Sequence, residues 1–159
     1  MPNYSTNAYS ASATFTPAAA SHVAGDAHGA AAEFVFRDRL GGVPATGSHV
    51  TIVSATLQIN GGTIETTAWR LHLYTVTPPS AYADDAAWDI SNATDLTSYL
   101  GYVDLSQVLD FGTTLYIDMP NLNKRIKMAG TSVFGYLVNG TTLTPQAVAH
   151  IVTLHCVAA

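Results

Sequence analysis

The chain has 159 residues, enough for one domain with a hydrophobic core and too few for two of ordinary size. Asp, Glu, Lys and Arg make up 11% of it, against roughly 25% in a typical soluble domain, and the formal charge is −5. Its six Lys and Arg form no continuous stripe, and it contains no run of about 18 apolar residues and no export signal, so the composition disfavours nucleic-acid binding, membrane insertion and secretion.

Residues 1–31 are predicted to form an extended N-terminal arm or edge ribbon. In YSASATFTP, Ala11, Ala13 and Phe15 alternate with Ser and Thr, which indicates an extended segment that ends at a proline. The following AAASHVAGDAHGAAA consists of small residues with too little bulk to form a core. The remaining residues, 32–159, are predicted to form a single β-sandwich domain.

Strands are predicted at residues 32–36 and 49–59, separated by a loop rich in Gly and Pro. The second strand alternates, and one of its faces carries Val53, Ala55, Leu57 and Ile59. The sequence Asn60-Gly61-Gly62 then supplies the residue types of a tight hairpin turn. We therefore expect a hairpin that leads directly into a neighbouring strand.

That neighbouring strand, TIETTAWRLHLYTV, resumes the alternation. Its core face is predicted to carry Trp69, Leu71 and Leu73. Its other face is predicted to carry Arg70, His72 and Tyr74 toward solvent or an interface.

Pro78-Pro79 ends this strand, because neither residue can donate a hydrogen bond to a sheet. In SAYADDAAWDI, Ser80 or Asp84 can cap a helix of about two turns. In SNATDLTSYL, Ser91 or Asn92 can cap a second short helix. Residues 80–98 are therefore the predicted helical insertion.

Further strands are predicted in SYLGYVDL, in TLYIDM as far as Pro120, in KRIKMA, in TSVFGYLV and in AVAHIVTLHCV. Many short strands separated by turns, without the spacing of βαβ units, are typical of antiparallel sheets. The predicted fold class is all-β: an antiparallel, jelly-roll-like β-sandwich with one short helical insertion.

Six histidines raise the question of a metal site: His22, His28, His49, His72, His150 and His155. His150 and His155 are five residues apart on a predicted strand, so they point to opposite faces and cannot share an ion. His22 and His28 flank Asp26 in a flexible stretch, which would bind a metal loosely at best. We expect no metal or other cofactor.

Two further groups have simple structural interpretations. Lys124, Arg125 and Lys127 are expected to form a solvated turn between strands. Cys156 lies in an apolar strand and is expected to be a small buried hydrophobic residue, and a lone cysteine excludes an internal disulfide.

No familiar catalytic motif is present, and we predict that the chain is not an enzyme. Asp84, Asp85 and Asp89 lack the ligand spacing of a calcium loop, and helix capping with a solvated face explains them. A hydrolase that uses paired carboxylates is a third possibility, without a substrate to propose.

Several phrases of the sequence resemble small virion proteins of tailed bacteriophages: YSASATFTPAAASHVAGDAHGAAAEF, LHLYTVTPPSAYADDAAWDI, YLGYVDL, GTSVFGYLV and AVAHIVTLHCV. The resemblance covers nearly the whole chain but includes no catalytic signature. It implies a capsid decoration or cement protein, located on the virion surface and made in the bacterial cytoplasm. It also implies the major capsid protein as partner and self-association, typically as a homotrimer.

Aromatic residues are the predicted contact points of such a protein, since Trp and Tyr concentrate binding energy at interface centres. The interface candidates are Tyr9, Phe15, Tyr82, Trp88 and Tyr99. The alternative is a carbohydrate- or receptor-binding sandwich of a phage tail or fibre. In that case Tyr82, Trp88 and Tyr99 would stack on sugar rings beside Asp84, Asp85 and Asp89.

Overall fold

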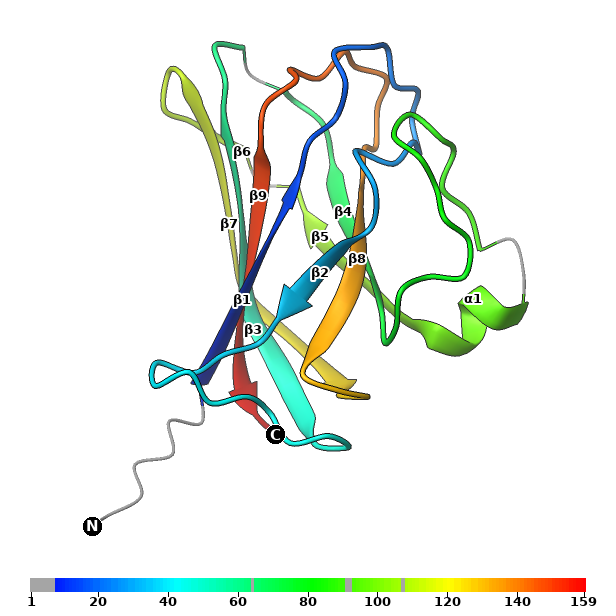
Figure 1. Cartoon of the computed structure of the whole chain (residues 1–159). Helices are drawn as coiled ribbons and strands as arrows, with labels where there is room; N and C mark the ends of the chain where they lie inside the picture. Colours follow the sequence, from blue (N-terminus) through cyan, green and yellow to red (C-terminus); the bar gives the residue numbers. More distant parts are fainter. Residues whose placement is uncertain (1–7, 64, 91–92, 107) are drawn as a thin grey trace.

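Strands of the computed structural model, which describes residues 8–63, 65–90, 93–106 and 108–159, form two antiparallel sheets packed face to face (Figure 1). The first sheet holds, in spatial order, β1 (Ala8–Phe15), β9 (His150–Ala158), β3 (His49–Asn60), β7 (Thr114–Lys127) and the short β6 (Val108–Asp110). The second sheet holds β2 (Ala32–Val35), β8 (Ser132–Val138), β4 (Trp69–Tyr74) and β5 (Tyr99–Leu105). The predicted antiparallel β-sandwich is confirmed.

The core lies between the two sheets and consists of the inward-facing apolar residues of both. Trp69, Leu71 and Leu73 are fully buried there, as the alternation of the strand predicts. Cys156 is also part of this core, and burial raises the pKa of its thiol to about 12. The predicted role of Cys156 as a small buried hydrophobic residue is confirmed.

Only the second of the two predicted helical turns forms. α1 (Ala93–Ser98) lies in the predicted SNATDLTSYL segment, while its predicted caps, Ser91 and Asn92, lie outside the described residues. The prediction of a two-turn helix in residues 80–90 is wrong, because that segment is an irregular loop. Its polar groups are bonded to distant segments instead of to a local helix.

The predicted hairpin at Asn60-Gly61-Gly62 is also wrong. β3 ends at Asn60, and β4, which follows it in the sequence, belongs to the other sheet. Neither Gly61 nor Gly62 has the positive φ that a tight hairpin turn would need. The chain therefore crosses from one sheet to the other between β3 and β4.

A β-bulge changes the phase of β3. The register of β3 with both of its neighbours shifts between Ile52 and Ser54. Ile52 and Ala55 therefore both face the core, and Val53, which simple alternation places on the core face, is only half-buried. The predicted inward positions of Ala55, Leu57 and Ile59 are confirmed.

β7 is one long strand where the sequence predicts two. It continues past Pro120, which pairs with Ser54, through Asn121 and Asn123 in positive-φ conformations. The extra residues between Pro120 and Lys124 are absorbed opposite the bulge of β3. The prediction of a solvated turn at Lys124, Arg125 and Lys127 is wrong, because these residues pair with β3.

The described part of the predicted N-terminal arm is an integral part of the sandwich. β1 pairs with β9 along its whole length, and Ala11, Ala13 and Phe15 are buried in the core. β1 is the edge strand of the first sheet, and its inward side chains belong to the core, so this part of the chain is an edge strand and not a detached arm. Alternation correctly indicated the strand. The small size of Ala11 and Ala13 gave no sign that the strand pairs with β9 and packs on the core.

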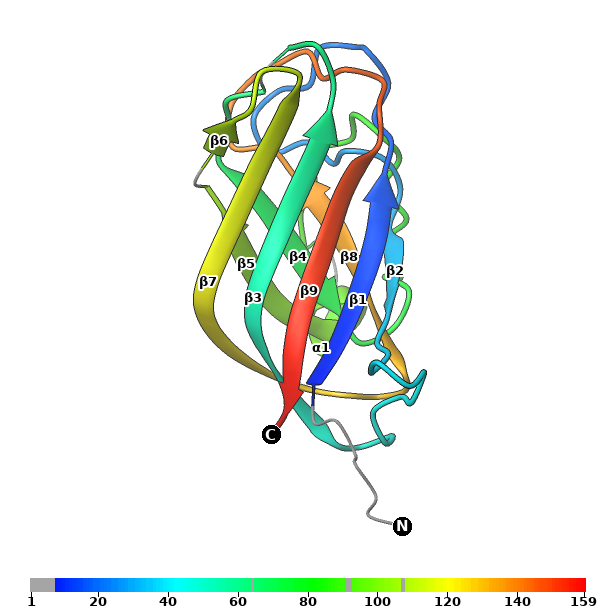
Figure 2. The same ribbon diagram turned by 90° about the vertical axis from the view of Figure 1, so that its left-hand side faces the viewer.

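The outer face of the first sheet is uncovered in the part of the chain that the structure describes. In Figure 2 this sheet faces the viewer, and no described segment crosses in front of β7, β3, β9 or β1. The outer face of the second sheet, in contrast, is covered by the loop between β4 and α1 (Figure 1). None of the described helices is long and apolar enough to cross a membrane.

Candidate functional site

A loop of residues 75–90, here called the covering loop, lies over the outer face of the second sheet (Figure 1). Tyr136 of β8 holds it there, because its hydroxyl donates to the Ser80 carbonyl and accepts from the Tyr82 N–H, both at 3.0 Å. The Tyr82 ring packs edge-on against Tyr136, with centroids 5.5 Å apart. The outer face of the sheet thus forms a second, smaller apolar cluster that includes Tyr74, Tyr136 and Val138.

Trp88 closes the covering loop over β4. Its indole lies over the His72 imidazole, with centroids 3.6 Å apart, and its Nε1 donates to the Tyr74 hydroxyl at 3.0 Å. The Tyr99 hydroxyl hydrogen-bonds to His72 Nδ1 at 2.9 Å. His72 is 6% exposed, so the prediction that it faces solvent or an interface is wrong. Burial, assisted by the positive charge of Arg70, lowers the pKa of His72 to about 4.

Tyr82, Trp88 and Tyr99, three of the predicted interface residues, are therefore brought together. All three side chains are half-buried, and their polar atoms form hydrogen bonds within the chain. The Tyr82 hydroxyl, for example, donates to Asp89 Oδ1 at 2.7 Å. Tyr9 and Phe15 lie far from them on β1. Phe15 is 1% exposed and belongs to the core, so its ring is not at the surface of this structure.

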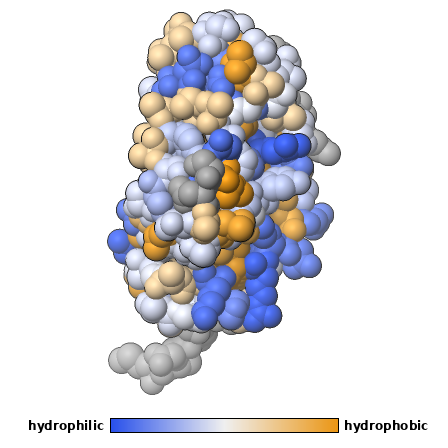
Figure 3. Space-filling view, turned by 90° about the vertical axis from the view of Figure 1, so that its right-hand side faces the viewer, coloured by the Kyte–Doolittle hydropathy of each residue, from blue (hydrophilic) through white to orange (hydrophobic). Residues whose placement is uncertain are grey.

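Near Trp88, the exposed Arg70 and Tyr102 and the half-buried Asp104 form a polar aromatic patch on β4 and β5 that sequence reasoning missed. The Arg70 guanidinium lies 5.4 Å from the centre of the Tyr102 ring, and Arg70 Nε is 3.5 Å from Asp104 Oδ1. The strand register places Arg70 opposite Asp104, and Tyr102 lies two residues before Asp104 on the same face of β5. Figure 3 shows this side of the molecule, where apolar residues form small patches between hydrophilic ones.

Asp84 fastens the covering loop to residues 17–31, here called the N-terminal loop. Its carboxylate accepts hydrogen bonds from the N–H groups of Ala18 and Gly29, each at 2.7 Å, and from His22 Nε2 at 3.1 Å. Burial opposes ionisation of Asp84, but these three donors outweigh it and lower the pKa of the carboxyl. The prediction that Asp84 caps a helix is therefore wrong.

His22 and His28 belong to the N-terminal loop, and their side chains point into the protein interior. The expectation that they lie in a flexible stretch is wrong. Both are fully buried, with ring centroids 4.4 Å apart. Burial alone would lower the pKa of His22, but the hydrogen bonds and charges of its partners, Asp84 foremost, raise it. His28 has no such partner, and burial together with the neighbouring His22 and His150 lowers its pKa to about 3.

His150 completes this histidine cluster from the start of β9. Its ring lies 5.8 Å from that of His28, and its Nε2 is 3.3 Å from Glu65 Oε2 without hydrogen-bond geometry. Glu65 also accepts from the Gln146 N–H at 2.8 Å. His155 is exposed on the opposite face of β9, which confirms the predicted divergence of His150 and His155. Among the described residues, no group of three or more His, Cys, Asp or Glu is arranged to hold a metal ion.

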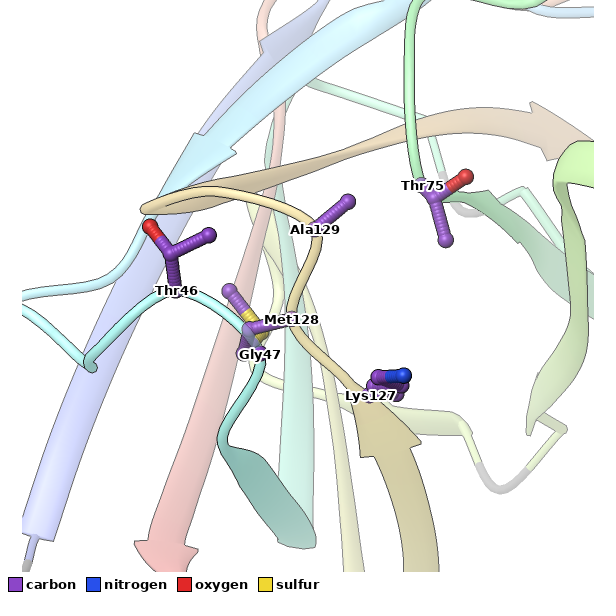
Figure 4. Close-up of a pocket in the computed structure, with 6 residues that line it drawn as sticks. All are labelled: Thr46, Gly47, Thr75, Lys127, Met128 and Ala129. Atoms are coloured by element: carbon purple, nitrogen blue, oxygen red, sulfur yellow. The ribbon is translucent and has the colours of Figure 1, made fainter.

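A separate hollow of about 320 Å³ opens beside the end of β7 (Figure 4). It is lined by Thr46, Gly47, Thr75, Lys127, Met128 and Ala129. Lys127 is the one charged side chain among these lining residues, so they supply no acid–base pair.

Together, fold and site define an antiparallel β-sandwich with one covered and one bare sheet face. Comparisons of the chain with protein-family models, with curated proteins and with solved structures find no match.

Proposed function

We propose that the chain is a noncatalytic structural protein of a bacteriophage particle. In this role it decorates or cements the capsid, binding adjacent subunits of the major capsid protein as a symmetric oligomer. The observation that carries the proposal is the bare outer face of the first sheet. The resemblance of the sequence to phage virion proteins supplies the identity of the partner.

This bare face has an unusual composition. β1, β9 and β3 are adjacent, and none of them contains Asp, Glu, Lys or Arg. Their outward side chains include Ser10, Ser12, Thr14, Thr51, Thr56, Gln58, Ile151, Thr153 and Val157. Three neighbouring strands thus present a broad surface without permanent charge, on a chain whose formal charge is −5.

Such a surface loses little free energy when another protein covers it, because burying an ionised group costs far more than burying a hydroxyl that keeps a hydrogen bond. Ser12 Oγ and Thr153 Oγ1 already bond to each other across β1 and β9 at 2.8 Å. The absence of carboxylates on these three strands also means that two copies of the face meet without like-charge repulsion. Depletion of charge is the compositional mark of interface centres.

The carbohydrate-binding alternative has less support. A sugar-binding platform needs exposed aromatic rings, whereas Trp88 and Tyr82 are half-buried and pack against His72 and Tyr136 within the chain. The exposed Tyr102 has the Arg70 guanidinium near its ring. A glycan array with hits that disappear in a Tyr102→Ala variant would favour this alternative over the capsid proposal.

Capsid binding by charge-insertion variants tests the proposal. Thr153→Lys places a charge in the middle of the bare face, and Thr142→Lys places the same charge in an exposed loop between β8 and β9. We expect co-sedimentation with purified capsids to weaken at least about 10-fold for Thr153→Lys, which corresponds to about 1.4 kcal/mol, and to be unchanged for Thr142→Lys. Equal binding by both variants, with native circular dichroism, would show that this face is not the contact surface.

A further inference from the structure

The covering loop (75–90) and the N-terminal loop (17–31) are joined to each other and form one layer. Ala27 N–H donates to the Ala86 carbonyl and Trp88 N–H donates to the Gly25 carbonyl, both at 2.9 Å. Asp85 N–H donates to the Ala27 carbonyl at 3.0 Å, and Asp84 adds the three bonds described above. We call residues 17–31 and 75–90 together the outer layer, because these hydrogen bonds join the two loops to each other.

One uncharged imidazole, His28, is buried where this layer meets the core. Its ring lies 4.6 Å from that of Trp69, and neither of its nitrogens has a hydrogen-bond partner among the described residues. The titratable groups that face it are His22 on its own loop, Asp84 on the covering loop and His150 on β9. Glu65, on the connection from β3, faces His150. His22 and His150 oppose a charge on His28, and the negative charge of Asp84 is already bound by three donors.

A second uncharged imidazole, His72, is buried on the opposite side of β4 beneath Trp88. The groups that face it are Tyr99 and Tyr102 from β5 and Arg70 from β4. Asp104 of β5 is paired with Arg70. A proton on His72 would therefore lie beside a positive charge and beneath an apolar ring.

We propose that acid releases the outer layer from the sandwich, and that protonation of His28 and His72 drives this release. The positive charge of a protonated imidazole needs solvation by water. Each of these two rings reaches water when the segment that covers it moves away. The strands behind the outer layer, β8 and β4, keep their hydrogen bonds to each other, since these pairs involve no residue of the layer. The bond from the His28 N–H to the Leu137 carbonyl of β8 is broken on release. Release would expose the aromatic face of the second sheet, including Tyr74 and Tyr136. The proposal does not depend on the capsid-binding role.

The two tryptophans allow a direct test of this release. In a Trp69→Phe variant, Trp88 on the outer layer is the single remaining tryptophan. Between pH 7 and about pH 4, the value to which the pKa of His72 is lowered, we expect acrylamide quenching of Trp88 to rise toward that of the unfolded chain. We expect the far-UV circular dichroism to keep its β-sheet signal over the same range.

Adding His28→Phe and His72→Gln should hold the quenching at its neutral-pH value, because neither replacement takes up a proton. His155→Gln is the matched control, since it removes an exposed imidazole from the other face of β9 and should behave like the parent. Exposure of Trp88 at the same pH in the parent and in the double variant would overturn the proposal. So would exposure that coincides with loss of the β-sheet signal.

Hydrogen exchange of the unmodified protein provides a second test that needs no variant. At about pH 4, the pKa of His72, the amides of Ala27 and Trp88 should lose protection, after correction for intrinsic rates, while those of Val152 and Leu154 on β9 keep it. Loss of protection in both groups together would overturn the proposal.

Discussion

The indole of Trp88 lies over the imidazole of His72 with the two ring centroids 3.6 Å apart and the planes inclined by 30°. This stack joins a loop residue to a sheet residue that simple alternation directs toward solvent. It turns the outer face of the second sheet into an apolar cluster, so the sandwich has three layers at this point.

Replacing Trp88 with alanine should destabilise the isolated protein by about 2 kcal/mol, because it removes a half-buried ring and its hydrogen bond to Tyr74. The pKa of His72 should return toward 6.5 as water reaches it. Urea unfolding and an NMR titration of the imidazole measure the two effects. Trp88→Phe, which keeps a ring over His72, should leave the pKa low; an unchanged pKa in both variants would contradict the stack.

Phe15→Ala should cost about 3 kcal/mol of unfolding free energy, because the ring is fully buried against Phe34 in the core. Phe111→Ala is the matched control: its ring is 64% exposed, and its removal should change stability by less than about 0.5 kcal/mol. Denaturant midpoints of the two variants measure the difference. Similar values for both would mean that β1 is a detachable arm after all.

Asp84→Asn should destabilise the protein by about 2 kcal/mol, since a carboxylate that accepts three hydrogen bonds becomes an amide with one acceptor oxygen. The pKa of His22 should fall, because the charge that holds its proton is lost. Asp118→Asn, on the exposed side of β7, serves as the control and should have little effect. An imidazole titration of His22 that is the same in both variants would refute the assigned role.

Stability should decrease as the pH falls from about 6.5 toward 4. His28 and His72 have folded pKa values of about 3 and about 4, below their unfolded value of 6.5, so their contribution is complete above pH 6.5 and is lost in acid. His22 acts with the opposite sign, because its raised pKa adds stability that is lost at higher pH. Each neutral imidazole should add up to about 1.4 kcal/mol per pH unit to the slope. Urea unfolding of His28→Phe should show a slope smaller by about that amount; an unchanged slope would exclude His28 as its source.

Gly62→Ala should change stability by less than about 0.5 kcal/mol, since Gly62 has no positive φ and open space surrounds the added methyl group. Gly101→Ala should cost about 1 kcal/mol or more, because its φ is +89° and the new Cβ would lie 2.7 Å from Lys124 Nζ. Thermal unfolding of both variants checks the contrast. A large loss at Gly62 would point back to a tight hairpin turn.

The local sequence pattern was sufficient to predict those elements whose structure depends mainly on residues close in the sequence. Alternation identified the main strands and placed Trp69, Leu71 and Leu73 on the core face, because successive side chains of a strand point to opposite sides. A capping pattern indicated the helix at Ala93–Ser98. Many short alternating segments separated by turn residues, together with the scarcity of helical periodicity, indicated the all-β class.

Only the tertiary structure decided which strands became neighbours. Asn60-Gly61-Gly62 permits a hairpin, but the chain crosses to the other sheet there, since pairing is chosen by contacts across the whole core. The burial of His22, His28 and His72 likewise depends on segments far away, as the 62-residue separation of His22 from Asp84 shows. Alternation reports which side of a strand a residue occupies, and it contains no information about what lies on that side.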